Sequence, residues 1–78
     1  MTLAQRVGAH LQAERVQRGM GQAPFAALLG IHCQQYQRYE HGERLPHPEI
    51  LVRMARRLNV SLDAWLGLAD GAGGLCGL

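Results

Sequence analysis

Residues 33–41 include several polar side chains that could make directional hydrogen bonds from one surface. If it is a helix turning about 100° per residue, Tyr36 and Tyr39 point to one side. The opposite side, within about 140° of arc, then carries Cys33, Gln34, Gln37, Arg38 and His41. Glutamine can pair bidentately with adenine and arginine with guanine, so this face suits contacts with base edges in a major groove. An ordinary solvated polar face is the alternative for any single amphipathic helix.

Cysteine and histidine in the same region raise two further chemistries. The spacing of His32, Cys33, His41 and His47 matches no common zinc pattern, and on a helix His32 and His41 would lie ~13 Å apart. We therefore expect neither a metal site nor a cofactor. Oxidation of Cys33 on a DNA-contacting face would add bulk or charge and weaken binding. The alternative is a small residue that contacts a thymine methyl group or nothing.

Local signals predict five short helices that would position these residues. The first runs from Leu3 to about Arg18 after a capping box of Thr2 and Gln5. The second and third cover residues 22–29 and 33–41, and the fourth begins at Pro48. The fifth covers residues 62–66 behind a serine cap. No strand pattern competes, so the sequence predicts an all-α fold.

The second and third predicted helices form a helix-turn-helix arrangement. The turn between them is short and contains Gly30, which can take the left-handed conformation. Ala26 is small where two helices must cross closely. Apolar contacts would come from Phe25, Leu29, Ile31, Tyr36 and Tyr39. In this context the DNA-contacting interpretation of the polar face is favoured over the solvated one.

Length and composition allow one small domain. The chain has 78 residues, of which 47% are hydrophobic and 18% charged, and dimerisation would stabilise a domain of this size. We place the domain at residues 1–68 and expect a flexible glycine-rich tail at 69–78. The net charge of +2 permits a nucleic-acid partner without requiring one.

The same composition disfavours several other classes of protein. Two cysteines are too few for a disulfide framework, and no apolar run approaches a membrane span or a signal peptide. We therefore expect a cytoplasmic protein with no membrane association. No cleft-forming length, nucleophile–base pair or phosphate loop indicates an enzyme.

The run RVQRGMGQAPFAALLGIHCQQYQRYEHGERLP, followed by LNVSLDAWLG, resembles the XRE family of helix-turn-helix regulators. Lambdoid phage repressors and Cro proteins belong to that family, and the resemblance covers about residues 3–68. It implies a compact five-helix lambda-repressor-like domain that binds double-stranded DNA as a homodimer, with its third helix in the major groove. A repressor that acts on an inverted-repeat operator is the function it implies.

The resemblance also implies roles for individual residues. The base-reading positions are Cys33, Gln34 and Arg38, with Gln37 adjacent, and the phosphate-contacting positions are Gln22, His41, Gly42 and Arg44. A structural salt bridge would join Arg15 to Glu40. The dimer interface would include Trp65, Leu66 and Leu68, which are alternatively core residues. Gly21 stands where the family has a capping serine or threonine, which weakens that cap.

Two alternatives stay open at this point. The same fold could serve as a protein-interaction module, such as an antitoxin or adaptor that binds a protein partner. The three arginines of the fourth helix (Arg53, Arg56 and Arg57) form either a phosphate-facing patch or, as we favour, a solvated face.

Overall fold

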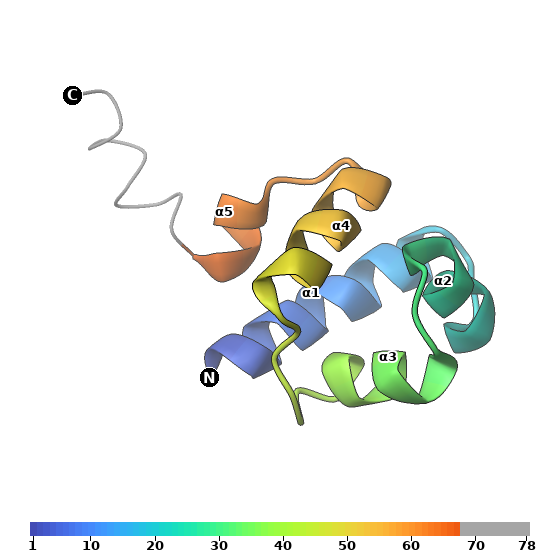
Figure 1. Cartoon of the computed structure of the whole chain (residues 1–78), viewed down its shortest axis with the longest axis horizontal. Coiled ribbons are helices and arrows are strands. Elements are labelled where there is room, and N and C mark those ends of the chain that lie inside the picture. The colour runs from blue at the N-terminus through green and yellow to red at the C-terminus, as the bar shows by residue number, and fades with distance from the viewer. Residues whose placement is uncertain (68–78) are drawn as a thin grey trace.

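The computed structural model describes residues 1–67, which fold into five α-helices without a strand (Figure 1). The helices are α1 (Leu3–Gln17), α2 (Gln22–Leu29), α3 (Cys33–Glu40), α4 (Pro48–Leu58) and α5 (Leu62–Leu66). The all-α prediction is confirmed. The predicted tail at 69–78 and the predicted interface residue Leu68 lie outside the described residues. None of the helices in the described part has the length and apolar character that a membrane span requires.

Helix ends follow the local signals in the sequence. At the start of α1, the backbone N–H of Gln5 donates to Thr2 Oγ1 at 3.1 Å, and the backbone N–H of Thr2 donates to Gln5 Oε1 at 2.8 Å. This is the predicted capping box. Gly21 precedes α2 without a side-chain cap, and Gly30 ends that helix in the left-handed conformation at φ 78°. The Ser61 hydroxyl caps α5 by accepting from the Ala64 amide.

One hydrophobic core joins all five helices. The core side chains are Val7, Leu11, Phe25, Ala26, Leu29, Tyr36, Tyr39, Leu51, Met54, Leu58 and Trp65. The rings of Phe25 and Tyr36 meet edge to face with centroids 5.4 Å apart, which ties α2 to α3. Helix α1 packs against α3 and α5, and α4 packs against α2 and α5. The pair α2–α3 therefore lies at one side of the molecule, away from α5 (Figure 1).

The contact between α1 and α3 depends on a glycine that the sequence analysis did not single out. A Cβ atom added at Gly8 would lie 2.5 Å from the carbonyl oxygen of Glu40 and 2.6 Å from that of Tyr39. Only a residue without a side chain lets the end of α3 approach α1 this closely. Gly8 thus sets the position of α3 relative to the rest of the domain.

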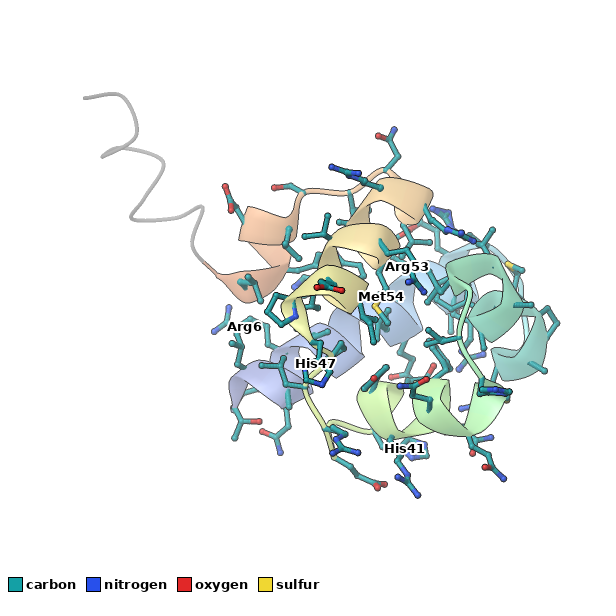
Figure 2. The ribbon with its side chains drawn as sticks, in the orientation of Figure 1. Arg6, His41, His47, Arg53 and Met54 are labelled. Carbon is teal, nitrogen blue, oxygen red and sulfur yellow. The ribbon has the colours of Figure 1, made fainter. Side chains whose placement is uncertain are left out.

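Two arginines of α4 hold the C-terminal end of α2. Arg57 Nη1 donates to the carbonyl oxygen of Leu28 at 2.9 Å, and Arg53 Nη1 donates to that of Gly30 at 3.4 Å. Figure 2 shows Arg53 on α4. The carbonyl group that it contacts belongs to Gly30, the C-cap residue of α2. The last carbonyl groups of a helix carry partial negative charge, so cations stabilise them. Arg53 and Arg57 are exposed, as expected for a solvated face, and their hydrogen bonds to the end of α2 also brace the helix-turn-helix.

Candidate nucleic-acid interface

The helix-turn-helix unit has the geometry that the sequence predicts. Helices α2 and α3 are joined by three residues, 30–32. The Ile31 amide donates back to the carbonyl oxygen of Ala26 at 3.0 Å, which closes α2 on the left-handed Gly30. The chain then enters α3 through His32, whose extended backbone forms the N-cap without a side-chain hydrogen bond. The turn therefore places α3 against α2 with its polar side directed outward.

The two sides of α3 differ in burial as predicted for most of their residues. Tyr36 and Tyr39 are buried, and Gln34, Arg38 and His41 are exposed. We use the name outer face of α3 for the predicted polar set of Cys33, Gln34, Gln37, Arg38 and His41. Figure 2 shows His41 at the end of α3 with its side chain directed away from the helices.

Cys33, at the start of α3, is less exposed than Gln34, Arg38 and His41. Its side chain is half-buried and packs against the hydrophobic core, and Gln37 Nε2 donates toward its sulfur at 3.8 Å. The Cα–Cβ bond of a helical residue tilts toward the helix N-terminus, which in the first turn of α3 directs the thiol toward the turn and α2. Cys33 thus lies at the edge of the outer face, next to the hydrophobic core.

A buried ion pair anchors the C-terminal end of α3 to α1. Arg15 Nε lies 2.8 Å from Glu40 Oε1, and Arg15 Nη2 donates to Glu40 Oε2 at 3.3 Å. The side chain of Glu40 is 4% exposed and that of Arg15 is 17% exposed. Arg15 Nη1 also donates to the carbonyl oxygen of Met20 at 3.1 Å, and the Tyr36 hydroxyl donates to Glu40 Oε1. The pair that the family resemblance implies is therefore present, with both of its charges hydrogen-bonded.

The ion pair also sets the protonation state of Glu40. Burial alone would raise the pKa of this carboxyl group, but hydrogen bonds from Arg15, Tyr36 and Gln22 outweigh burial and hold the pKa below its ordinary value. Burial and the neighbouring carboxylate raise the pKa of Tyr36, so its hydroxyl stays protonated and able to donate. At neutral pH Glu40 is ionised and only accepts hydrogen bonds.

Gln22 connects this buried charge to the surface. Its Nε2 donates to Glu40 Oε2 at 3.1 Å, and its Oε1 accepts from Gln37 Nε2 at 3.1 Å. A further glutamine of α3, Gln35, donates to the Tyr39 hydroxyl at 2.8 Å. Sequence reasoning placed Gln22 and Gln37 at the interface but missed their contact, since no periodicity relates positions on two different helices.

The loop after α3 lies beside the outer face. A shallow hollow brings together Gln34, Arg38 and Arg44 with His32, Gln35 and Tyr39. Gly42 has φ 74°, and a Cβ atom there would lie 2.9 Å from Gln5 Cγ, so the loop is packed against the start of α1. His41 Nδ1 lies 3.6 Å from Glu43 Oε2. The structure thus places Gln34 and Arg38, two of the predicted base-reading residues, beside the loop residue Arg44 on one surface.

The two predicted dimer-interface residues within the described part of the chain, Trp65 and Leu66, differ in exposure. Trp65 is 3% exposed and stacks on His10, with ring centroids 5.7 Å apart and an interplanar angle of 6°. It therefore belongs to the core of a single chain, whereas Leu66 is half-buried. Within residues 1–67, no three histidine, cysteine or acidic side chains are grouped closely enough to hold a metal ion.

The fold and this surface define a helix-turn-helix protein, and comparisons with known proteins agree. The family model for helix-turn-helix proteins matches residues 11–65. Because this match covers well over half of the sequence, the chain belongs to the XRE family of helix-turn-helix proteins, a class of DNA-binding transcription regulators. The resemblance found in the sequence is confirmed.

Two individual proteins illustrate this relationship. The chain is 44% identical over 46 residues to the cryptic phage CTXphi transcriptional repressor RstR of Vibrio cholerae serotype O1, a segment that covers 59% of this chain and 41% of that repressor. The chain therefore matches less than half the length of this relative. The crystal structure of the clp gene regulator ClgR from C. glutamicum matches with a TM-score of 0.73 and 22% identity, covering 92% of this chain and 94% of that one. At this identity the second likeness supports the fold alone.

Proposed function

We propose that this protein is a sequence-specific repressor that binds an inverted-repeat operator as a homodimer, with α3 in the major groove of DNA. The observation that carries the proposal is the outer face of α3, where Gln34 and Arg38 are exposed beside Arg44. These side chains offer the donors and acceptors that base edges require. The similarity to a phage transcriptional repressor supports the choice of a repressor.

The start of α2 supplies a site for a phosphate group. One proton of the Gln22 amide group goes to Glu40, which leaves the second proton for a phosphate oxygen. The unpaired backbone amides and the positive end of the helix dipole favour an anion at the same place. The loop residues His41, Gly42 and Arg44 would contact the backbone on the other side of α3. Together these contacts would fix the orientation of α3 in the groove.

A homodimer would place two copies of α3 in successive major grooves. Half-sites would then lie about one helical turn apart, ~34 Å. We assign Leu66 on α5 and Leu68 to the dimer contact. Because Trp65 is buried within one chain, we assign it the role of supporting α5 from inside.

Selection of binding sites from a randomised duplex library tests the proposal. We expect enrichment of an inverted repeat at about 150 mM salt, where non-specific binding is weak. The experiment needs protein shown to be folded by circular dichroism. Folded protein that enriches no sequence would contradict the proposal and favour a protein-interaction module with this fold. The modest net charge of +2 is the feature that supports that second candidate.

A further inference from the structure

Three side chains form a relay of hydrogen bonds that runs from the buried ion pair to the outer face of α3. Glu40 Oε2 accepts from Gln22 Nε2 at 3.1 Å, and Gln22 Oε1 accepts from Gln37 Nε2 at 3.1 Å. We use the name glutamine relay for Glu40, Gln22 and Gln37. The relay crosses from α3 to α2 and back, so it depends on the packing of the two helices.

The carboxylate at the buried end fixes the direction of both amide groups. An ionised carboxylate only accepts hydrogen bonds, and Glu40 is kept ionised by Arg15 Nε at 2.8 Å. Gln22 must therefore turn its NH₂ group toward Glu40 and its carbonyl oxygen toward Gln37. Gln37 must then turn its own NH₂ group toward Gln22, because two carbonyl oxygens cannot share a hydrogen bond.

The side-chain amide of Gln37 has one hydrogen-bonding atom left for a ligand. One of its protons points to Gln22 Oε1, and its nitrogen also donates toward Cys33 Sγ at 3.8 Å. The carbonyl oxygen Oε1 is what remains. An unrestrained glutamine offers both a donor and an acceptor and can turn either toward a base. The relay thus converts Gln37 into an acceptor.

We infer that the glutamine relay makes Gln37 a specificity-determining residue, which accepts a hydrogen bond from the exocyclic amino group of a base. In the major groove these groups are N4 of cytosine and N6 of adenine, whereas guanine and thymine present acceptors there. The relay therefore selects cytosine or adenine over guanine or thymine at one position of the strand that Gln37 faces. This inference rests on the proposed function, since α3 must lie in the groove for Gln37 to reach a base.

The test is selection of binding sites with the wild-type protein and with the variants Gln37→Met and Gln22→Met. Methionine keeps the unbranched shape of glutamine and removes the amide group. We expect the wild type to enrich cytosine or adenine at one position in each half-site. Gln37→Met should lose that preference by roughly fivefold or more and keep the preferences at other positions.

Gln22→Met separates the relay from a simple phosphate contact. Loss of a phosphate contact weakens all sequences alike. Loss of the relay additionally frees the Gln37 amide group to turn over and donate, so guanine should become acceptable at that same position. The double variant should show the preference of Gln37→Met. Gln12→Met, which alters an exposed glutamine on α1, should leave every base preference unchanged.

The outcomes distinguish this inference from the proposed function. Guanine or thymine at the position that Gln37→Met alters would overturn the inference, as would an unchanged preference at that position in Gln22→Met. An enriched operator whose preferences Gln37→Met leaves intact would overturn the inference alone. Folded wild-type protein that enriches no sequence would overturn both.

Discussion

The polar side chains of α3 form two groups: a held group, fixed by hydrogen bonds within the protein, and an exposed group. Glu40 and Gln37 are hydrogen-bonded to side chains of other helices. Gln34 and Arg38 are exposed on the same helix. One helix thus combines side chains whose orientation is set before any ligand arrives with side chains that can adapt to a ligand.

This difference assigns separate tasks to the two groups. A side chain already held in place loses little conformational entropy on binding, but it offers one fixed hydrogen-bonding group. An exposed glutamine or arginine loses up to about 2 kcal/mol of rotamer entropy when it is ordered, but it can match the base it meets. We therefore expect the largest changes in stability from substitutions in the held group, and changes in DNA affinity without a large change in stability from substitutions in the exposed group.

The largest effect is expected at the buried ion pair. Glu40→Gln removes the charge opposite Arg15 and should lower the free energy of unfolding by about 3–5 kcal/mol, because a partly buried guanidinium is left uncompensated. Urea unfolding measures this. Glu14→Gln is the matched control, since Glu14 pairs with Arg18 at 3.4 Å in a more exposed setting and should cost only ~0–1 kcal/mol. Equal losses in the two variants would contradict the central role of Glu40.

Acid should weaken the same ion pair in the wild-type protein. The folded pKa of Glu40 lies below its ordinary value of 4.5, so the unfolded chain binds a proton first as the pH falls. The stabilisation from Glu40 is complete above the ordinary pKa and is lost as the pH falls through the folded pKa. Urea unfolding between pH 6 and pH 3 should therefore show a steeper decline for the wild type than for Glu40→Gln. Parallel pH profiles of the free energy of unfolding in the two proteins would show that Glu40 is not the source of the acid sensitivity.

In the exposed group, Gln34→Ala should separate binding from stability. We expect the affinity for the selected operator to fall by about 1–3 kcal/mol through the loss of a base contact. The free energy of unfolding should change by no more than ~0.5 kcal/mol. Fluorescence anisotropy at fixed salt and urea unfolding give the two values. Gln12→Ala on α1 is the control, and an equal loss of affinity there would show that position on the outer face does not matter.

The smallest effect concerns the support of α2 by α4. Arg57→Met removes the hydrogen bond to the carbonyl oxygen of Leu28 and should lower the free energy of unfolding by about 1 kcal/mol or less. Arg56→Met alters the neighbouring exposed arginine and should be close to neutral. Thermal unfolding of the pair measures the difference. If Arg56→Met is the more damaging variant, the bracing role assigned to Arg57 is wrong.

Local features of the fold could be predicted because their signals lie within a few residues of each other. The capping box of Thr2 and Gln5, the left-handed Gly30 and the serine cap of α5 each act over one turn of chain. The alternation of buried tyrosines and exposed polar residues on α3 follows from helical periodicity. These signals were enough to define the helices and the outer face.

Contacts between distant positions could not be predicted in the same way. The close approach at Gly8, the link from Gln22 to Gln37 and the bond from Arg57 to α2 join residues on different helices. Each depends on how the helices pack, and no spacing in the sequence encodes it. The pair of Arg15 and Glu40 was anticipated only through the family resemblance. The half-burial of Cys33 could not be predicted either, because periodicity gives the side of a helix and not what covers its first turn.

The most direct test of the central claim, that the outer face of α3 identifies DNA bases, compares Arg38→Ala with Arg56→Ala. Both variants remove one exposed arginine, so they change the net charge equally. Binding sites are selected from one randomised library with each variant and with the wild type. We predict that Arg38→Ala loses the base preference at one position of each half-site and that Arg56→Ala keeps the wild-type operator. An Arg38→Ala variant with the full wild-type preference would contradict the claim.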